Sequence, residues 1–119
     1  MFQIRKDQVD VFRENAVAGP RRKIVAEIER VLPEESARLG HGKLVAFVDR
    51  NIEKADSYGL GSERGTCTYC EAALLYGEDF DTNPKTAWSR DVLPIERMDQ
   101  EVKWKLLVLR IQMDHGKDV

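Results

Sequence analysis

The segment from residue 95 to residue 113 constrains the fold most, because as a single helix it carries two separate apolar stripes. At about 100° per residue, six apolar side chains gather on one side and four on the other. The first stripe is Ile95, Met98, Val102, Leu106, Leu109 and Met113, and the second is Trp104, Leu107, Val108 and Ile111. Charged and polar residues separate them, with Lys103 and Arg110 along one flank, so a single packing surface cannot cover both. The helix is therefore either enclosed within its own domain or keeps one stripe for a partner.

The other substantial apolar patterns also have a helical period. Residues 6–18, with a stripe of Val9, Phe12 and Ala16, predict a first helix that ends at Gly19, and Pro20 opens a second helix that continues to residue 32. A short helical turn follows at residues 34–39. A third helix is expected to end at Gly59, and Ser62 caps a fourth helix that ends at Gly77. Residues 86–92 predict one short turn that presents Trp88, and Pro94 opens the last helix.

Alternating polar and apolar residues never persist long enough to predict a strand. A chain of 119 residues has room for one moderate hydrophobic core. The sequence therefore predicts an all-α fold, in which residues 1–119 form a single-domain bundle of about five helices plus one or two short helical turns.

Charge and hydropathy exclude several classes of partner. The chain is 34% charged with a net charge of −2, whereas binding to nucleic acid needs clustered, uncompensated Lys and Arg. No run approaches the roughly 18 to 20 apolar residues of a membrane span, and the first residues lack the apolar core of a signal peptide. We expect a cytoplasmic protein with no nucleic-acid and no membrane partner.

Cys67 and Cys70 form a C-x-x-C pair, which is half of a zinc site or the core of a redox motif. Further zinc ligands at a suitable spacing and a strand-to-helix context are both missing. The two cysteines share one side of a helix with Leu74, which favours packing in the core. A small metal-binding or redox-active protein that uses Cys67 and Cys70 is kept as an alternative.

Asp79, Asp81 and Asn83 imitate the start of a calcium loop, but Pro84 stands where the loop needs glycine and Arg90 where it needs glutamate. No nucleophile beside a base and no phosphate-binding glycine loop is present. We therefore expect no catalytic residue, no metal, no cofactor and no enzymatic activity.

Protein binding is the remaining chemistry, and the second stripe of the last helix is its candidate surface. Tryptophan is enriched where interfaces gain most of their affinity, so Trp88 is added to the set. The candidate partner-binding residues are Trp104, Leu107, Val108, Ile111 and Trp88. The occupant would be a protein partner or a second copy of this chain, and burial inside the bundle is the alternative.

Three groups of residues together resemble a known family: Asp7-Gln8-Val9 with Phe12; Tyr58-Gly59-Leu60 with Ser62-Glu63-Arg64; and Leu75 to Asp81 with Trp88 and Leu93-Pro94. This pattern is similar to that of small helical accessory proteins encoded in bacterial type VI secretion effector modules. The resemblance implies a non-enzymatic, co-chaperone-like protein that binds a secreted effector or its adaptor and assists loading. An immunity protein that neutralises a cognate toxin is the competing hypothesis, although the balanced charge favours it less.

Overall fold

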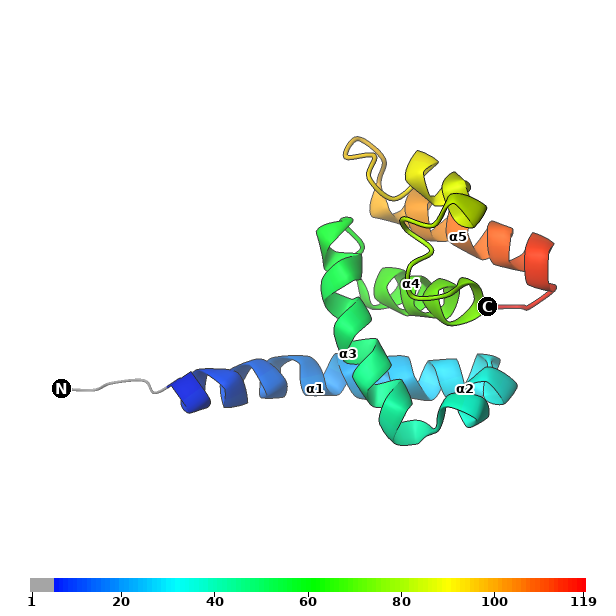
Figure 1. The fold of residues 1–119 in the computed structure, drawn as a ribbon. Coiled ribbons are helices and arrows are strands. Elements are labelled where there is room, and N and C mark those ends of the chain that lie inside the picture. The colour runs from blue at the N-terminus through cyan, green and yellow to red at the C-terminus, as the bar shows by residue number, and fades with distance from the viewer. Residues whose placement is uncertain (1–5) are drawn as a thin grey trace.

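The computed structural model describes the backbone from residue 6 and the side chains from residue 19. Five α-helices and one 3-10 helix follow one another, and this part of the chain contains no strand (Figure 1), which confirms the predicted all-α class. The helices are α1 (Lys6–Val31), α2 (Pro33–Leu39), α3 (His41–Ser57), α4 (Glu63–Tyr76), η1 (Pro84–Asp91) and α5 (Gln100–His115).

The first two predicted helices are one helix, because α1 continues through Pro20 without a break. A proline inside a helix removes one backbone hydrogen bond and crowds the preceding turn, which usually kinks or breaks the helix. Gly19 and Pro20 are both exposed, and among the described residues no atom apart from the adjoining backbone lies within 4 Å of the position that a Cβ on Gly19 would take. No described neighbour therefore turns the chain at this point. The predicted stripe of Val9, Phe12 and Ala16 lies outside the described side chains.

Helix α4 forms the centre of the bundle, where it packs against α1, α3 and α5. Every residue from Gly65 to Ala73 is buried. Most of these side chains are small, so the surrounding helices approach the α4 backbone closely. Figure 1 shows α4 between α1 on one side and α5 on the other, with α3 crossing α1 beside it.

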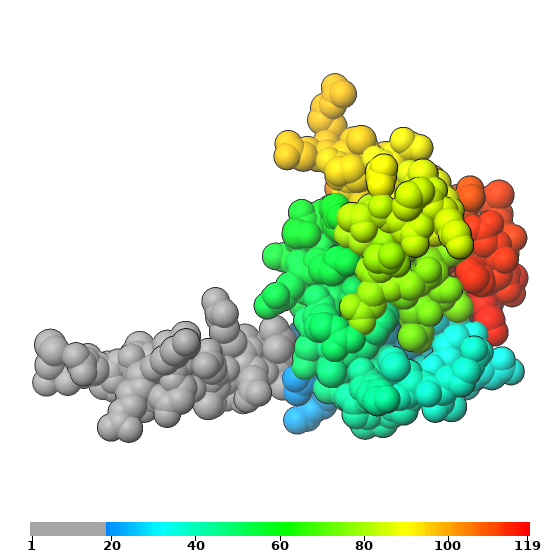
Figure 2. All heavy atoms as spheres, viewed as in Figure 1, coloured from blue at the N-terminus to red at the C-terminus, as the bar shows by residue number. Residues whose placement is uncertain are grey.

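The segment between α4 and α5 covers one face of this core. Figure 2 shows it as a layer of yellow-green and yellow atoms in front of the other helices. Phe80 anchors it, since its fully buried ring lies 5.1 Å from the ring of Tyr69 on α4 and 6.1 Å from that of Trp88 on η1. The segment is thus fixed to the core by aromatic packing.

Two helix ends were predicted correctly. Ser62 Oγ accepts a hydrogen bond of 3.0 Å from the Gly65 amide at the start of α4, and Gly77 ends this helix with a φ of 111°. The start of the last helix was predicted too early, at Pro94. Asp99 caps α5 by accepting a hydrogen bond of 2.9 Å from the Glu101 amide. Ile95 and Met98 therefore lie outside the helix, in the turns that precede it.

The Asp99 cap predicts a measurable change in stability. Asp99→Ala should lower the free energy of unfolding by roughly 0.5–2 kcal/mol, because the Glu101 amide loses its acceptor. Asp99→Asn, which keeps an acceptor oxygen, should retain most of the stability that the cap provides. Urea denaturation of the three proteins tests this, and equal losses in both variants would contradict a capping role.

Candidate protein-binding surface

The two apolar stripes of the last helix have exchanged the roles that we predicted for them. Leu107 and Ile111 have no exposed surface and belong to the core. Trp104 and Val108 are half-buried, and Trp104 packs against the core cluster. In this fold, Leu107 and Ile111 cannot reach a partner, so the prediction is corrected for these two residues, which are internal.

Lys103 explains the rotation of α5 that places these residues inside. Its side chain was predicted to lie on a charged flank, but the residue is only 4% exposed. The Nζ atom donates hydrogen bonds of 2.7 Å to the Tyr58 carbonyl and 2.8 Å to the Leu93 carbonyl. Because residues four apart lie on one side of a helix, the side that carries Lys103 also carries Leu107 and Ile111 into the core.

Trp88 is also half-buried and forms part of an aromatic cluster. Its ring lies 5.2 Å from that of Tyr76, and the Arg110 guanidinium lies over it at 5.2 Å. Trp104 is held similarly, with Arg64 at 5.1 Å from its ring. Both tryptophans thus hold α5 to the rest of the bundle, with only part of each ring reaching solvent.

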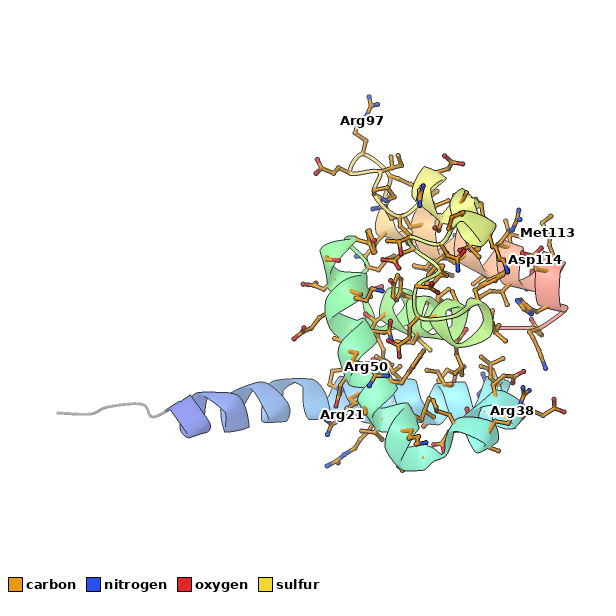
Figure 3. The ribbon with its side chains drawn as sticks, in the orientation of Figure 1. Arg21, Arg38, Arg50, Arg97, Met113 and Asp114 are labelled. Atoms are coloured by element: carbon orange, nitrogen blue, oxygen red, sulfur yellow. The ribbon has the colours of Figure 1, made fainter. Side chains whose placement is uncertain are left out.

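The opposite stripe faces outward along the whole of α5. The exposed fractions are 46% for Val102, 37% for Leu106, 54% for Leu109 and 75% for Met113. Figure 3 shows Met113 pointing away from the body of the molecule near the end of α5. The spacing of four, three and four residues is that of a coiled-coil seam. We call Val102, Leu106, Leu109 and Met113 the α5 stripe.

The charges beside the α5 stripe are paired within the helix. Lys105 forms an ion pair of 3.0 Å with Glu101, and Arg110 forms one of 2.9 Å with Asp114. The Tyr76 hydroxyl donates a hydrogen bond of 2.7 Å to Asp114, and this bond together with Arg110 lowers the pKa of that carboxyl. The α5 stripe is therefore an apolar surface, and the charged residues beside it neutralise one another in pairs.

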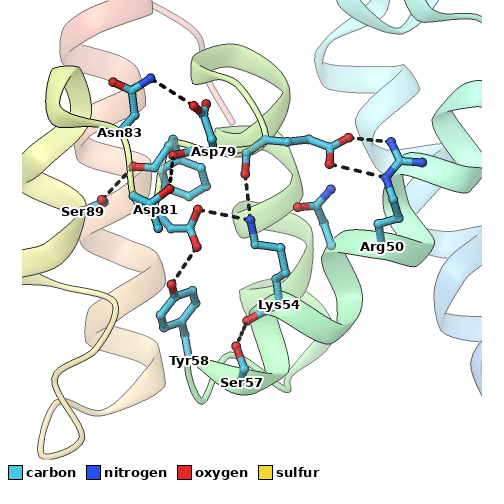
Figure 4. Close-up of polar contacts among 12 residues, drawn as sticks. Arg50, Lys54, Ser57, Tyr58, Asp79, Asp81, Asn83 and Ser89 are labelled. Atoms are coloured by element: carbon cyan, nitrogen blue, oxygen red, sulfur yellow. Dashed lines mark hydrogen bonds and ion pairs between the residues drawn. The ribbon is translucent and has the colours of Figure 1, made fainter.

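The acidic loop after α4 holds the fold together and is not arranged as a calcium site. Asp81 accepts hydrogen bonds of 2.7 Å from the Tyr58 hydroxyl and 3.1 Å from Lys54 (Figure 4), while Asn83 donates to Asp79. The acids therefore do not converge on one point, and no group of three metal-type ligands occurs among the described residues. Burial and Asp81 raise the pKa of Tyr58 to about 12.

Cys67 and Cys70 are buried free thiols, as the core-packing prediction requires. Burial raises the pKa of both, that of Cys70 to about 12, which disfavours the thiolate that redox or metal chemistry needs. The sequence analysis did not predict the burial of their neighbour Glu71. This carboxyl is fully buried and accepts a hydrogen bond of 3.0 Å from the Cys67 thiol.

Comparisons with protein-family models, with curated proteins and with solved structures found no match to this chain. Within the described residues, no helix has both the length and the apolar character needed to cross a membrane.

The exchange of the two stripes predicts opposite outcomes for two leucines on one helix. Leu107→Ala should lower the free energy of unfolding by about 2–5 kcal/mol, because it leaves a cavity in the core. Leu109→Ala should change it by no more than about 0.5 kcal/mol, as is usual at the surface. Chemical denaturation measures both. Similar losses for the two variants would contradict the rotation of α5.

The burial of Glu71 predicts how its replacement depends on pH. Burial raises the pKa of this carboxyl above the ordinary value of 4.5 in the folded chain. Below pH 4.5, Glu71 is protonated in both the folded and the unfolded chain. As the pH rises, the unfolded chain releases this proton first, because the pKa of Glu71 is higher in the folded chain. The free energy of unfolding of the wild type therefore falls. Glu71→Gln should therefore gain stability relative to the wild type between about pH 4 and about pH 7.

Denaturation curves at both pH values measure this gain, with Glu63→Gln as the control at an exposed carboxyl. A stability difference between Glu71→Gln and wild type that stays constant with pH would contradict a raised pKa.

Proposed function

We propose that this chain is a non-enzymatic accessory protein that binds an effector of a bacterial type VI secretion module, or the adaptor of that effector, through the α5 stripe. The exposed row of Val102, Leu106, Leu109 and Met113 carries the proposal. Contiguous apolar surface is unusual on a protein that works alone, and it marks sites of protein interaction. The motifs that resemble the accessory family supply the biological setting.

The spacing of the α5 stripe indicates what covers it. A seam of four-three-four spacing accepts the apolar side chains of a second helix, which insert between its own. Complete burial of a large apolar side chain contributes roughly 1.5–3 kcal/mol. These side chains are already partly covered, so each gains less on binding. This favours a partner of moderate affinity, as a protein needs if it must later release its client.

The paired charges beside the α5 stripe favour an accessory role over an immunity role. Tight neutralisation of a toxin typically uses a surface of one charge sign that complements the toxin. Here Lys105 and Arg110 already have partners on their own helix. The partner helix should therefore have an apolar face and little net charge along its edges.

The proposal can be tested by coexpressing the chain with the effector and the adaptor of the same secretion module. The wild type should copurify with one of them. Leu106→Glu/Leu109→Glu should abolish this at an unchanged melting temperature, because two charges would be buried without partners. Ala37→Glu/Ala46→Glu adds the same charges at exposed positions on α2 and α3 and should copurify normally.

Three outcomes would count against the proposal. Copurification that survives the α5 changes would contradict the surface, and failure of the wild type to copurify would contradict the accessory role. The third outcome is a homodimer, which sedimentation equilibrium of the isolated chain would detect. If Leu106→Glu/Leu109→Glu dissociated such a dimer, the α5 stripe would be assigned to a second copy of this chain.

A further inference from the structure

The ion pairs beside the α5 stripe all have the same orientation around the helix. At about 100° per residue, Lys105 lies roughly 70° from the centre of the stripe on one side and Arg110 roughly 70° on the other. Their partners Glu101 and Asp114 lie farther round, each at roughly 110°. Each pair is neutral as a whole, but its cation lies nearer the stripe than its carboxylate.

Both cations lie within reach of a helix that covers the stripe. The exposed fraction of the side chain is 58% for Lys105 and 40% for Arg110. With Leu106 as heptad position a, Lys105 is a g position and Arg110 an e position, and these positions face the edges of a partner helix. The other two edge positions are Lys103, which is buried in the core, and Gln112. No edge position of α5 therefore carries an acid.

A second copy of α5 would meet these cations with cations. In a parallel pair, position g of one helix faces position e of the other, so Lys105 would face Arg110 of the second copy. Reversing one helix brings g opposite g and e opposite e, so each cation would face its own equivalent. Like charges that face one another across an interface suppress the wrong partner. The edges of α5 thus oppose pairing with a second copy in both directions.

We propose that the α5 stripe receives a helix of a different chain, whose apolar face is bordered by a carboxylate on each edge. This inference rests on the proposed function and specifies the chemistry of the partner. The two carboxylates lie opposite Lys105 and Arg110, where they replace repulsion with attraction. A cation one turn beyond each carboxylate, as in α5 itself, leaves the partner helix little net charge along its edges.

The edge charges select the partner, and the apolar stripe supplies most of the affinity. An exposed ion pair changes an affinity by no more than about fivefold. Two attractive pairs in one partner and two repulsive pairs in another together separate the two affinities by at least roughly tenfold.

Two designed helical peptides of equal length test the proposal. Both have Leu at positions a and d, and one has Glu at every e and g position where the other has Lys. Each repels its own copies through these edges. In fluorescence anisotropy, the Glu peptide should bind at least roughly tenfold more tightly than the Lys peptide. The net charge of −2 on the chain favours the Lys peptide, so this preference reports the local charges of the site.

Variants locate the preference on α5. Leu106→Glu/Leu109→Glu should abolish the binding of both peptides, and Lys105→Glu/Arg110→Glu should reverse their order. Arg110 also lies over the Trp88 ring, so Lys105→Glu alone is the milder variant. It should lower the preference at least about threefold at an unchanged melting temperature. Lys43→Glu, the same change at an exposed position of α3, should leave the preference unchanged.

Salt provides a test on the wild type alone, in case the variants do not fold. Raising the ionic strength from about 0.1 M to about 1 M shortens the Debye length from about 10 Å to about 3 Å. The affinities for the two peptides should therefore become nearly equal. A preference for the Glu peptide that persists undiminished at high salt would overturn the proposal.

Four further results would also overturn it: no binding of either peptide, equal binding at low salt, tighter binding of the Lys peptide, or a homodimer formed through the stripe. The accessory role is tested separately. A preference for the Glu peptide without copurification of effector or adaptor would support this inference and contradict the accessory role. Copurification together with equal binding of the two peptides would do the opposite.

Discussion

The burial of α4 on all sides is the constraint on which the rest of the structure depends. A helix whose residues from Gly65 to Ala73 are all covered needs neighbours in every direction, and α1, α3 and α5 provide them. Polar groups on such a helix have no water to bind, so they need internal partners. Thr66 finds one in the Leu60 carbonyl at 2.8 Å. Glu71 has one for its Oε1 in the Cys67 thiol at 3.0 Å, while its Oε2 has none in the structure.

A second constraint, the buried ammonium of Lys103, decides which side of α5 meets α4. Placing this charge inside is costly unless hydrogen bonds replace its hydration, and the Tyr58 and Leu93 carbonyls do so. Rotating α5 to bury the other stripe would withdraw Lys103 from both carbonyls. Tyr58 and Leu93 thus set the orientation of α5, and through it the exposure of Leu106 and Leu109.

Periodicity and capping chemistry were sufficient for much of the fold and insufficient for the surface. The Ser62 cap and the end of α4 at Gly77 follow from local rules, and the structure agrees. The break predicted at Pro20 did not occur, although an interior proline usually kinks or breaks a helix, and no described neighbour redirects the chain at this point. The two stripes of α5 are nearly equivalent on a helical wheel, so the pattern does not show which of them is buried. The Tyr58 and Leu93 carbonyls, which bind Lys103, decide it. The burial of Glu71 likewise depends on contacts that periodicity does not encode.

Arg64 joins the buried helix α4 to α5. Its guanidinium lies 5.1 Å from the centre of the Trp104 ring and donates a hydrogen bond of 3.0 Å to the Val119 carbonyl beyond α5. Two nearby basic residues have other partners, since Lys23 pairs with a carboxylate of α4 and Arg30 with one of α1. Because Trp104 lies on the side of α5 opposite the α5 stripe, Arg64 supports α5 from that side and leaves the stripe exposed.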